Sequence, residues 1–238
     1  MTTRTRPSRG LPLLRFALLL AAAWLGTAVP AEADVTAIVV GTELRVTGDD
    51  APNVIRLLQS IDDLRIEIWV GNSFLVDRPR AIFMTIRIDA GGGDDTVLID
   101  ETNGVFTNTE ATTILGGDGD DTITAGAGAE TIDGGPGNDD ITGGRAADTI
   151  HGGPGDDHIH WNANAPLLTS TDGADLVNGE AGIDWLEMQG NALAETYSVA
   201  PNGDRALVSR GGTLLNIGTL EHVLIFMMGG DDHFTVVV

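Results

Sequence analysis

The chain has 238 residues and carries 35 acidic side chains against 13 arginines and no lysine, which gives a formal net charge of −22. A surface this acidic disfavours nucleic acid and anionic membranes as partners. The absence of Cys excludes disulfides and a thiol nucleophile, and 32 Gly with only 5% aromatic residues are unlike a globular domain with a wide core.

Residues 1–33 have the features of a secretory signal peptide. Four arginines lie within the first 15 residues, an apolar run follows at 16–29, and Ala31-Glu32-Ala33 supplies a small-x-small cleavage pattern. The apolar run is shorter than the roughly 20 residues that normally span a membrane. Cleavage is therefore favoured over the alternative, an uncleaved membrane anchor. We expect a secreted protein, extracellular or periplasmic en route, without a membrane span.

Residues 34–115 are predicted to form an N-terminal β-solenoid or capping region. Runs of alternating apolar and polar residues, such as 44–47 and 64–68, are separated by turn residues, as β-strands require. A glycine-rich loop ends in Asp94 and Asp95, for which a plain turn and an ion site are both open. Capping is expected because the end of a solenoid exposes sheet edge and core.

Residues 116–187 divide into eight consecutive units of nine residues without a gap. The eighth position is always a branched aliphatic residue: Ile123, Ile132, Ile141, Ile150, Ile159, Leu168, Val177 and Leu186. The sixth position is acidic in seven units: Asp121, Glu130, Asp139, Asp148, Asp157, Asp175 and Asp184. Nine residues make about two and a half helical turns, so an apolar stripe would change face with every unit. The period instead predicts a glycine-rich turn followed by a three-residue strand with one inward side chain, two units forming one coil.

The units that begin at Gly116, Gly134 and Gly152 match the pattern G-G-x-G-x-D-x-U-x, in which U is a large aliphatic residue, at every defined position. This array resembles the RTX (haemolysin-type) nonapeptide-repeat family. The resemblance implies an all-β fold, a right-handed parallel β-roll or β-solenoid, with the neighbouring regions as flanking solenoid coils. It also implies Ca²⁺ as the cofactor, bound between turns that stack on the same edge of the roll.

In the family, the ligands of one ion come from units 18 residues apart. Carried over, this pairs Asp121 with Asp139, Asp139 with Asp157 and, less regularly, Asp157 with Asp175, because Ser170 and Thr171 replace two glycines there. The expected ligand set is Gly116, Gly117, Asp118, Gly119, Asp121, Gly134, Gly135, Gly137, Asp139, Gly152, Gly153, Gly155, Asp157 and Asp175. Calcium takes oxygen ligands, which exposed carbonyls and carboxylates supply. The alternative is that these aspartates only make turn hydrogen bonds.

The units that begin at Ala125, Gly143, Trp161 and Gly179 are predicted to lie on the opposite edge. Arg145 places a cation beside the expected ion, Glu130 is one methylene longer than Asp, and the loop of the third unit lacks a carboxylate. We expect two or three good Ca²⁺ sites on the first edge and at most one poor site here.

Residues 188–238 are predicted to be a C-terminal β-strand or capping region. The stretch 223–234 resembles 86–97, because both place alternating strand residues before a G-G-D-D loop. Asp231 and Asp232 are therefore a second candidate turn or ion site.

The expected function is calcium binding coupled to folding, as a structural, adhesion or matrix module rather than an enzyme. Candidate partners besides calcium are an anionic polysaccharide or a cell-surface component. The chain has neither an H-E-x-x-H nor a G-x-S-x-G motif. The alternative is a polysaccharide lyase or epimerase on a β-helix scaffold. His158 and His160 flank Ile159 and are interpreted as a solvent-facing pair, with a transition-metal pair as the alternative.

Overall fold

The computed structural model describes residues 34–161, 175–189, 196–202, 205–210, 213–219, 222–226 and 233–236. They belong to one unit, Ala31–Val238. The predicted signal peptide and the predicted roles of Ser170, Thr171, Asp231 and Asp232 fall outside the described residues. None of the helices in the described part is both long and apolar enough to cross a membrane.

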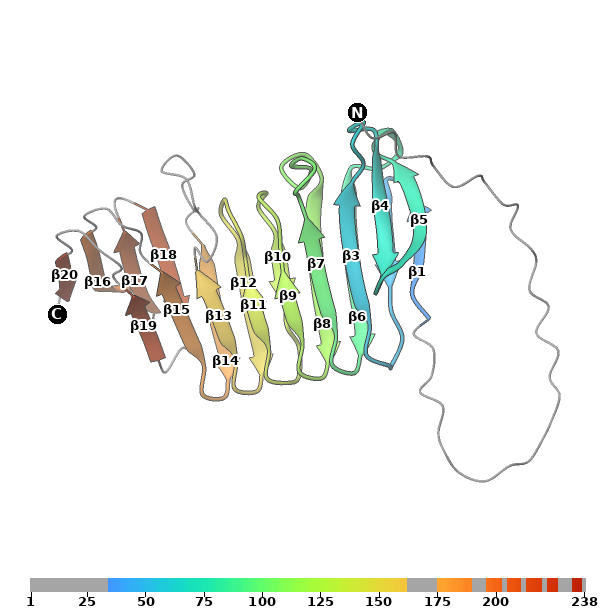
Figure 1. Cartoon of the computed structure of the whole chain (residues 1–238). Helices are drawn as coiled ribbons and strands as arrows, with labels where there is room; N and C mark the ends of the chain where they lie inside the picture. Colours follow the sequence, from blue (N-terminus) through green and yellow to red (C-terminus); the bar gives the residue numbers. More distant parts are fainter. Residues whose placement is uncertain are drawn as a thin grey trace, which may run out of the picture. The chain divides into compact units, whose positions relative to one another are not determined.

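Nearly all regular structure in these residues is β-strand, arranged in two sheets (Figure 1). In spatial order, the first sheet contains β1 (Thr36–Val40), β2 (Glu43–Thr47), β6 (Thr85–Gly92), β8 (Ala111–Asp118), β10 (Thr131–Asp133), β12 (Thr149–Pro154), β14 (Leu176–Ala181), β18 (Thr213–Gly218), β17 (Arg205–Arg210), β16 (Thr196–Asn202) and β20 (His233–Val236). The second sheet contains β19 (His222–Phe226), β15 (Trp185–Gln189), β13 (His158–Trp161), β11 (Asp140–Thr142), β9 (Thr122–Thr124), β7 (Thr96–Asp100), β3 (Val54–Gln59), β4 (Arg65–Val70) and β5 (Ser73–Pro79). A short 3-10 helix, η1, covers Arg80–Ile82.

Successive strands between β6 and β15 alternate between the two sheets, and each pairs in parallel with the next strand of its own sheet. This is the predicted parallel β-roll, in which one coil consists of two strands and two turns. The turns that lead from the first sheet to the second form what we call the first edge, and the return turns form the second edge. The first edge follows the lower margin of Figure 1.

The core of the repeat is one side chain thick. Ile123 of β9, Ile132 of β10 and Ile141 of β11 are each fully buried, while the residues on either side of them in their strands are not. Their inward positions follow from the alternation of side chains along a strand. Burial of each such residue contributes about 1.5–3 kcal/mol.

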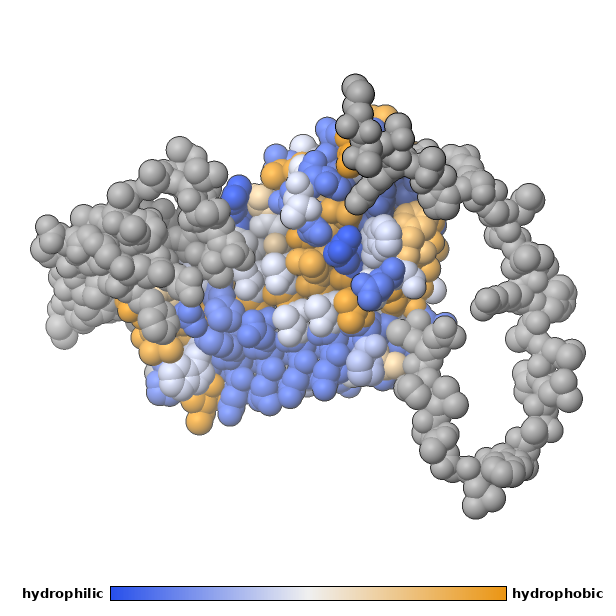
Figure 2. Space-filling view, in the orientation of Figure 1, coloured by the Kyte–Doolittle hydropathy of each residue, from blue (hydrophilic) through white to orange (hydrophobic). Residues whose placement is uncertain are grey.

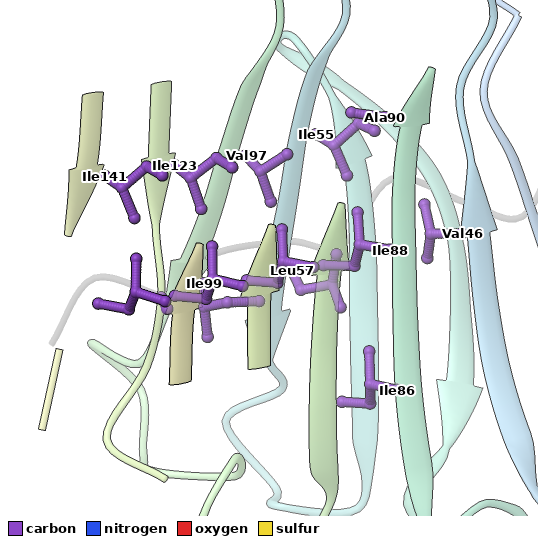
Figure 3. Close-up of a cluster of buried hydrophobic side chains, with 14 of the residues drawn as sticks. Val46, Ile55, Leu57, Ile86, Ile88, Ala90, Val97, Ile99, Ile123 and Ile141 are labelled. Carbon is purple, nitrogen blue, oxygen red and sulfur yellow. The ribbon is translucent and has the colours of Figure 1, made fainter. Parts of the chain in front are cut away.

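The coils before the repeat are broader than those of the repeat, because their strands are longer. β6 buries Ile86, Ile88 and Ala90, and β3 buries Ile55 and Leu57. Figure 3 shows these side chains in one continuous cluster with those of the repeat. A feature that the repeat pattern does not reveal is the set of antiparallel strands at this end, in which β1 pairs with β2 and β4 pairs with both β3 and β5.

Candidate metal centre

Six turns of the first edge lie wholly within the described residues, and they are stacked and share one design. They cover residues 48–53, 90–95, 116–121, 134–139, 152–157 and 179–184. Their sixth residues form a row through the stack: Asn53, Asp95, Asp121, Asp139, Asp157 and Asp184. Each of these residues is at most 2% exposed. Most of the outer surface of this margin is hydrophilic (Figure 2), so the acidic row lies beneath a mainly polar surface.

One carboxylate oxygen of each aspartate in the row is used to connect two coils. Oδ1 of Asp121 accepts a hydrogen bond of 2.8 Å from the backbone N–H of Asp95, and Oδ1 of Asp139 accepts one of 2.8 Å from Asp121. The same bond, at 2.9 Å, joins the N–H of Asp139 to Asp157. When the accepting carboxylate is ionised, each of these hydrogen bonds is stronger than one between neutral groups. The bonds also fix the orientation of each carboxylate.

The second carboxylate oxygen points into a buried space without a protein donor. Oδ2 of Asp95, Asp121, Asp139 and Asp157 is buried and makes no hydrogen bond within the described residues. A buried ionised oxygen without a partner is costly. These four atoms therefore call for a cation, which is the simplest way to satisfy a repeated row of oxygens.

The electrostatics of the row agree with this need. The pKa of Asp139 is raised to about 7, mainly by burial and also by the neighbouring carboxylates of Asp157 and Asp121, although the N–H of Asp121 opposes the shift. Burial likewise raises the pKa of Asp95, Asp121 and Asp157 to about 6. Protein groups alone do not offset the desolvation of these charges, so a bound divalent cation would stabilise the ionised form.

The first glycine of each repeat keeps the space beside the aspartate open. A Cβ atom on Gly116 would overlap Oδ2 of Asp121 and the carbonyl oxygen of Gly134 in the next coil, and a Cβ on Gly134 would overlap the corresponding oxygens of Asp139 and Gly152. Carboxylate and carbonyl oxygens thus converge where a side chain would otherwise sit. An all-oxygen donor set fits a hard cation such as Ca²⁺.

The second and fourth glycines are required by the backbone and by the stacking. Gly117 and Gly119 have φ of 115° and 128°, and a Cβ on either would overlap a carbonyl oxygen of the preceding coil, that of Gly91 or Gly93. Only glycine adopts these angles without strain. The repeat therefore packs its turns so closely that backbone carbonyls lie next to each aspartate.

A second row, formed by the fifth residues of the turns, has a different role. The N–H of Asn138 donates to Oδ1 of Asp120 at 2.7 Å, and the N–H of Asp156 donates to the side-chain oxygen of Asn138 at 2.8 Å. These side chains are exposed. Turn hydrogen bonds, the alternative to ion binding considered from the sequence, therefore explain the outer row. In the buried row, Asp95, Asp121, Asp139 and Asp157 each have a further carboxylate oxygen that makes no hydrogen bond within the described residues.

The second edge differs from the first in its acids. The N–H of Glu130 donates to Oδ1 of Asp148, and the N–H of Asp148 donates to Oδ1 of Asp175, each at 2.8 Å. Burial raises the pKa of Glu130 to about 8, and the charge of Glu101 adds to the shift while the Thr107 hydroxyl opposes it. The Arg145 side chain is exposed, and Ala146 takes a φ of 66° in the same turn. This edge lacks the uniform glycine geometry of the first.

The predicted pairing of Asp157 with Asp175 is wrong. The N–H of Asp157 donates to Oδ1 of Asp184 at 3.0 Å, and Asp175 faces Asp148 on the second edge. The pairs Ile150–Val177 and Ile159–Leu186 are 27 residues apart rather than 18, so the coil between β13 and β14 contains nine additional residues. The turn that begins at Gly179 consequently lies on the first edge, not on the second.

The other predicted ligand residues lie on the first edge, but the side chain of Asp118 lies outside the buried row. The glycines and the three aspartates of the perfect units occupy the stacked turns 116–121, 134–139 and 152–157. The side chain of Asp118 is exposed and does not join the buried row, although its carbonyl oxygen accepts the N–H of Gly93 at 2.7 Å.

The row contains two acids that the predicted ligand set omits, Asp95 and Asp184. Asp95 could have been identified from the G-G-G-D-D loop, which resembles the glycine-rich turn of the repeat units although no nonapeptide precedes it. The position of Asp184 could have been inferred from the sixth unit, WNANAPLLT. This unit has neither glycine nor acid, so it lacks the residues of a stacking turn. Removing this unit from the count moves the following turn to the first edge.

Comparison with known proteins supports the identification of the repeat. The family model of the RTX calcium-binding nonapeptide repeat matches in four copies, over residues 106–141, 133–161 and 168–187. Neither the curated proteins nor the solved structures yield a match to the chain. Residues 106–187 of this chain are therefore an RTX calcium-binding nonapeptide-repeat array.

Proposed function

We propose that the chain is an exported structural module whose roll is closed by Ca²⁺ ions bound along the first edge, and that it is not an enzyme. The observation that carries the proposal is the row of buried Oδ2 atoms of Asp95, Asp121, Asp139 and Asp157, each without a hydrogen-bond partner in the described residues. Asp121, Asp139 and Asp157 were part of the ligand set expected from sequence.

The row defines how many ions the first edge would hold. Five aspartates are stacked in the order Asp95, Asp121, Asp139, Asp157, Asp184, and five turns leave four spaces between them. Each space would be bounded by carboxylates of two turns and by backbone carbonyls. This is one or two more than the two or three sites expected from sequence, because Asp95 and Asp184 extend the row.

Binding and folding are coupled in this proposal. Without ions, ionised carboxylates in one buried row repel one another and oppose closure of the roll. Extracellular calcium modules bind with dissociation constants of about 10⁻⁴–10⁻³ M, so a calcium-poor compartment would leave the array open. At tenfold saturation each site contributes about 1.4 kcal/mol. The predicted signal peptide at residues 1–33 supports export to a calcium-rich compartment.

The proposed role after folding is that of an adhesion or matrix component, with an anionic polysaccharide or cell-surface group as the candidate partner. The enzyme alternative needs carboxylates that can reach a polymer. Asp121, Asp139 and Asp157 are at most 1% exposed, so they are placed to bind ions between coils rather than a substrate. Their burial favours a structural role.

Calorimetric titration with Ca²⁺ tests the proposal. We expect about four ions per chain on the first edge, with Mg²⁺ as the control ion that does not substitute, since it prefers a strict octahedral site and keeps its waters. The triple variant Asp121→Asn, Asp139→Asn, Asp157→Asn should lose almost all binding. If this variant binds calcium as fully as the parent chain, the first edge is not the calcium site.

A further inference from the structure

The outer face of the second sheet carries two histidines between two carboxylates. His158 and His160 lie on β13, Asp140 lies on the adjacent strand β11, and Glu187 lies on β15 on the other side. The strand register places His158 opposite Asp140 and His160 opposite Glu187. Ile141, Ile159 and Leu186 point inward on the same strands, so these four polar side chains project outward.

Three of these side chains, those of Asp140, His158 and His160, are close enough to share one ion. Nε2 of His160 lies 3.2 Å from Oδ1 of Asp140, and Nε2 of His158 lies 3.4 Å from Oε2 of Glu187. The two imidazole centroids are 4.2 Å apart. One potential ligand atom each from Asp140, His158 and His160 lie within 4.8 Å of one another. A tetrahedral zinc site with bonds of about 2.0–2.2 Å separates its ligand atoms by about 3.3–3.6 Å, which small side-chain rotations would achieve here.

A second observation also favours a ligand. Nε2 of His158 is buried and makes no hydrogen bond within the described residues, although 39% of the side chain is exposed. Its contact with Oε2 of Glu187 is an ion pair only when the imidazole is protonated, and a buried ring nitrogen without a hydrogen bond is unusual in a folded protein. A metal bond would satisfy it, and neutral imidazole nitrogen is a common protein ligand for metals.

We propose that Asp140, His158 and His160 bind one divalent transition-metal ion of the zinc class. Imidazole suits such ions, whereas Ca²⁺ takes oxygen ligands, so this site would be chemically distinct from the first edge. With Nε2 of His160 on the metal, its Nδ1 faces Oε2 of Glu187 at 3.8 Å. A carboxylate in that position orients the imidazole and increases its basicity. Two neighbouring strands, β11 and β13, hold the three ligands, and Glu187 lies on β15 beside them, which gives the site a rigid base.

The control for this site is on the other sheet. His151 of β12 also projects outward beside a carboxylate, with Nδ1 2.9 Å from Oε1 of Glu180. Its side chain is 37% exposed, close to the 39% of His158. It is not among the residues that form a potential three-ligand group in the described part of the chain. His151→Gln therefore removes one His–carboxylate pair and leaves the proposed site intact.

The test is a calorimetric titration of the purified chain with Zn²⁺ in saturating Ca²⁺, so that zinc does not enter the edge sites. We expect one zinc ion per chain. Loss of an outer-shell partner alone costs about 10–100-fold in metal affinity, so His158→Gln and His160→Gln should each weaken binding by at least that range. His151→Gln should leave it unchanged. Bound Co²⁺ should give visible absorption bands typical of a four-coordinate ion in the parent and not in His158→Gln.

Asp140→Asn is the second ligand variant and should also weaken zinc binding; because the Asp140 side chain is 54% exposed, we expect this substitution to leave the fold intact. Circular dichroism in Ca²⁺ verifies that each variant is folded. No zinc binding in saturating Ca²⁺, or an equal loss in His151→Gln, overturns the proposal and leaves the cluster as a His–carboxylate network. Because folding is followed separately, a failure of this site is distinguishable from a failure of the calcium sites.

Discussion

The backbone N–H of Asp157 donates a 3.0 Å hydrogen bond to Oδ1 of Asp184, which lies 27 residues further along the chain. The same bond spans 18 residues between Asp121 and Asp139 and between Asp139 and Asp157. The row of buried aspartates therefore continues across a coil that has nine extra residues. The stacking of the turns, not the count of nonapeptides, determines which acids meet.

Asparagine substitutions at positions 184 and 175 test this register. Asp184→Asn should lower the calcium stoichiometry by about one ion, since it removes a carboxylate from the last space of the first edge. Asp175→Asn should leave the first-edge stoichiometry unchanged, because Asp175 faces Asp148. Asparagine retains the Oδ1 acceptor in both cases. The opposite ranking in a calcium titration would restore the 18-residue pairing of Asp157 with Asp175.

Substitutions at Asp139 and Asp148 compare the two edges. Asp139 borders two spaces of the row, so Asp139→Asn should remove about two ions. Asp148 accepts the same kind of ladder hydrogen bond on the second edge, which makes Asp148→Asn a matched control with little effect on calcium binding. Equal losses in the two titrations would contradict a one-edged array.

Gly134→Ala tests whether the space beside Asp139 is an ion site. The added Cβ would overlap Oδ2 of Asp139 and the carbonyl oxygen of Gly152, and Gly134 is not a positive-φ glycine, so the effect comes from lost space rather than backbone strain. We expect a loss of about one or two ions. Gly92→Ala is the control, because its Cβ would meet no heavy atom closer than 3.6 Å. A Gly134→Ala chain with full calcium binding would exclude this space as the site.

Glu130, on the second edge, should make the stability of the fold depend on pH. Burial raises the pKa of Glu130 to about 8, above its value of about 4.3 in the unfolded chain. Between these values the folded state holds more protons than the unfolded state, so the free energy of unfolding falls as the pH rises from about 4 to 8. Glu130→Gln removes this contribution.

The measurement is the melting temperature in saturating Ca²⁺ between pH 5 and 8.5, for the parent chain and for Glu130→Gln. The parent should lose more stability across this range than the variant. Parallel curves for the two proteins would mean that Glu130 is ionised at neutral pH in the folded state.

Much of the roll follows from local chemistry that sequence displays directly. Ile123, Ile132 and Ile141 recur at a period that only a strand in each unit can bury on one side, and Gly117 and Gly119 mark positions that need a positive φ. These features are set within nine residues. They explain why the all-β roll, the calcium-binding repeat and the first-edge aspartates of the three perfect units were predictable.

The register after β13 was not predictable from period alone. The sixth unit keeps an aliphatic residue at its eighth position, Leu168, so the count continues without interruption, while its loop lacks the glycines that let turns stack. Which units stack depends on contacts between coils, such as that of Asp157 with Asp184. The antiparallel pairing of β3 with β4 is likewise a long-range choice that runs of alternating residues do not specify.

The most direct test of the central claim is the melting temperature of the purified chain in excess EGTA and in about 1 mM Ca²⁺, at a pH near 7.5. Four sites at about 1.4 kcal/mol each would raise the melting temperature by about 10–20 °C. The chain in EGTA should also lose β-sheet signal in the far-ultraviolet circular dichroism spectrum. An identical melting temperature and spectrum in the two solutions would contradict the claim that calcium ions between stacked turns hold the roll together.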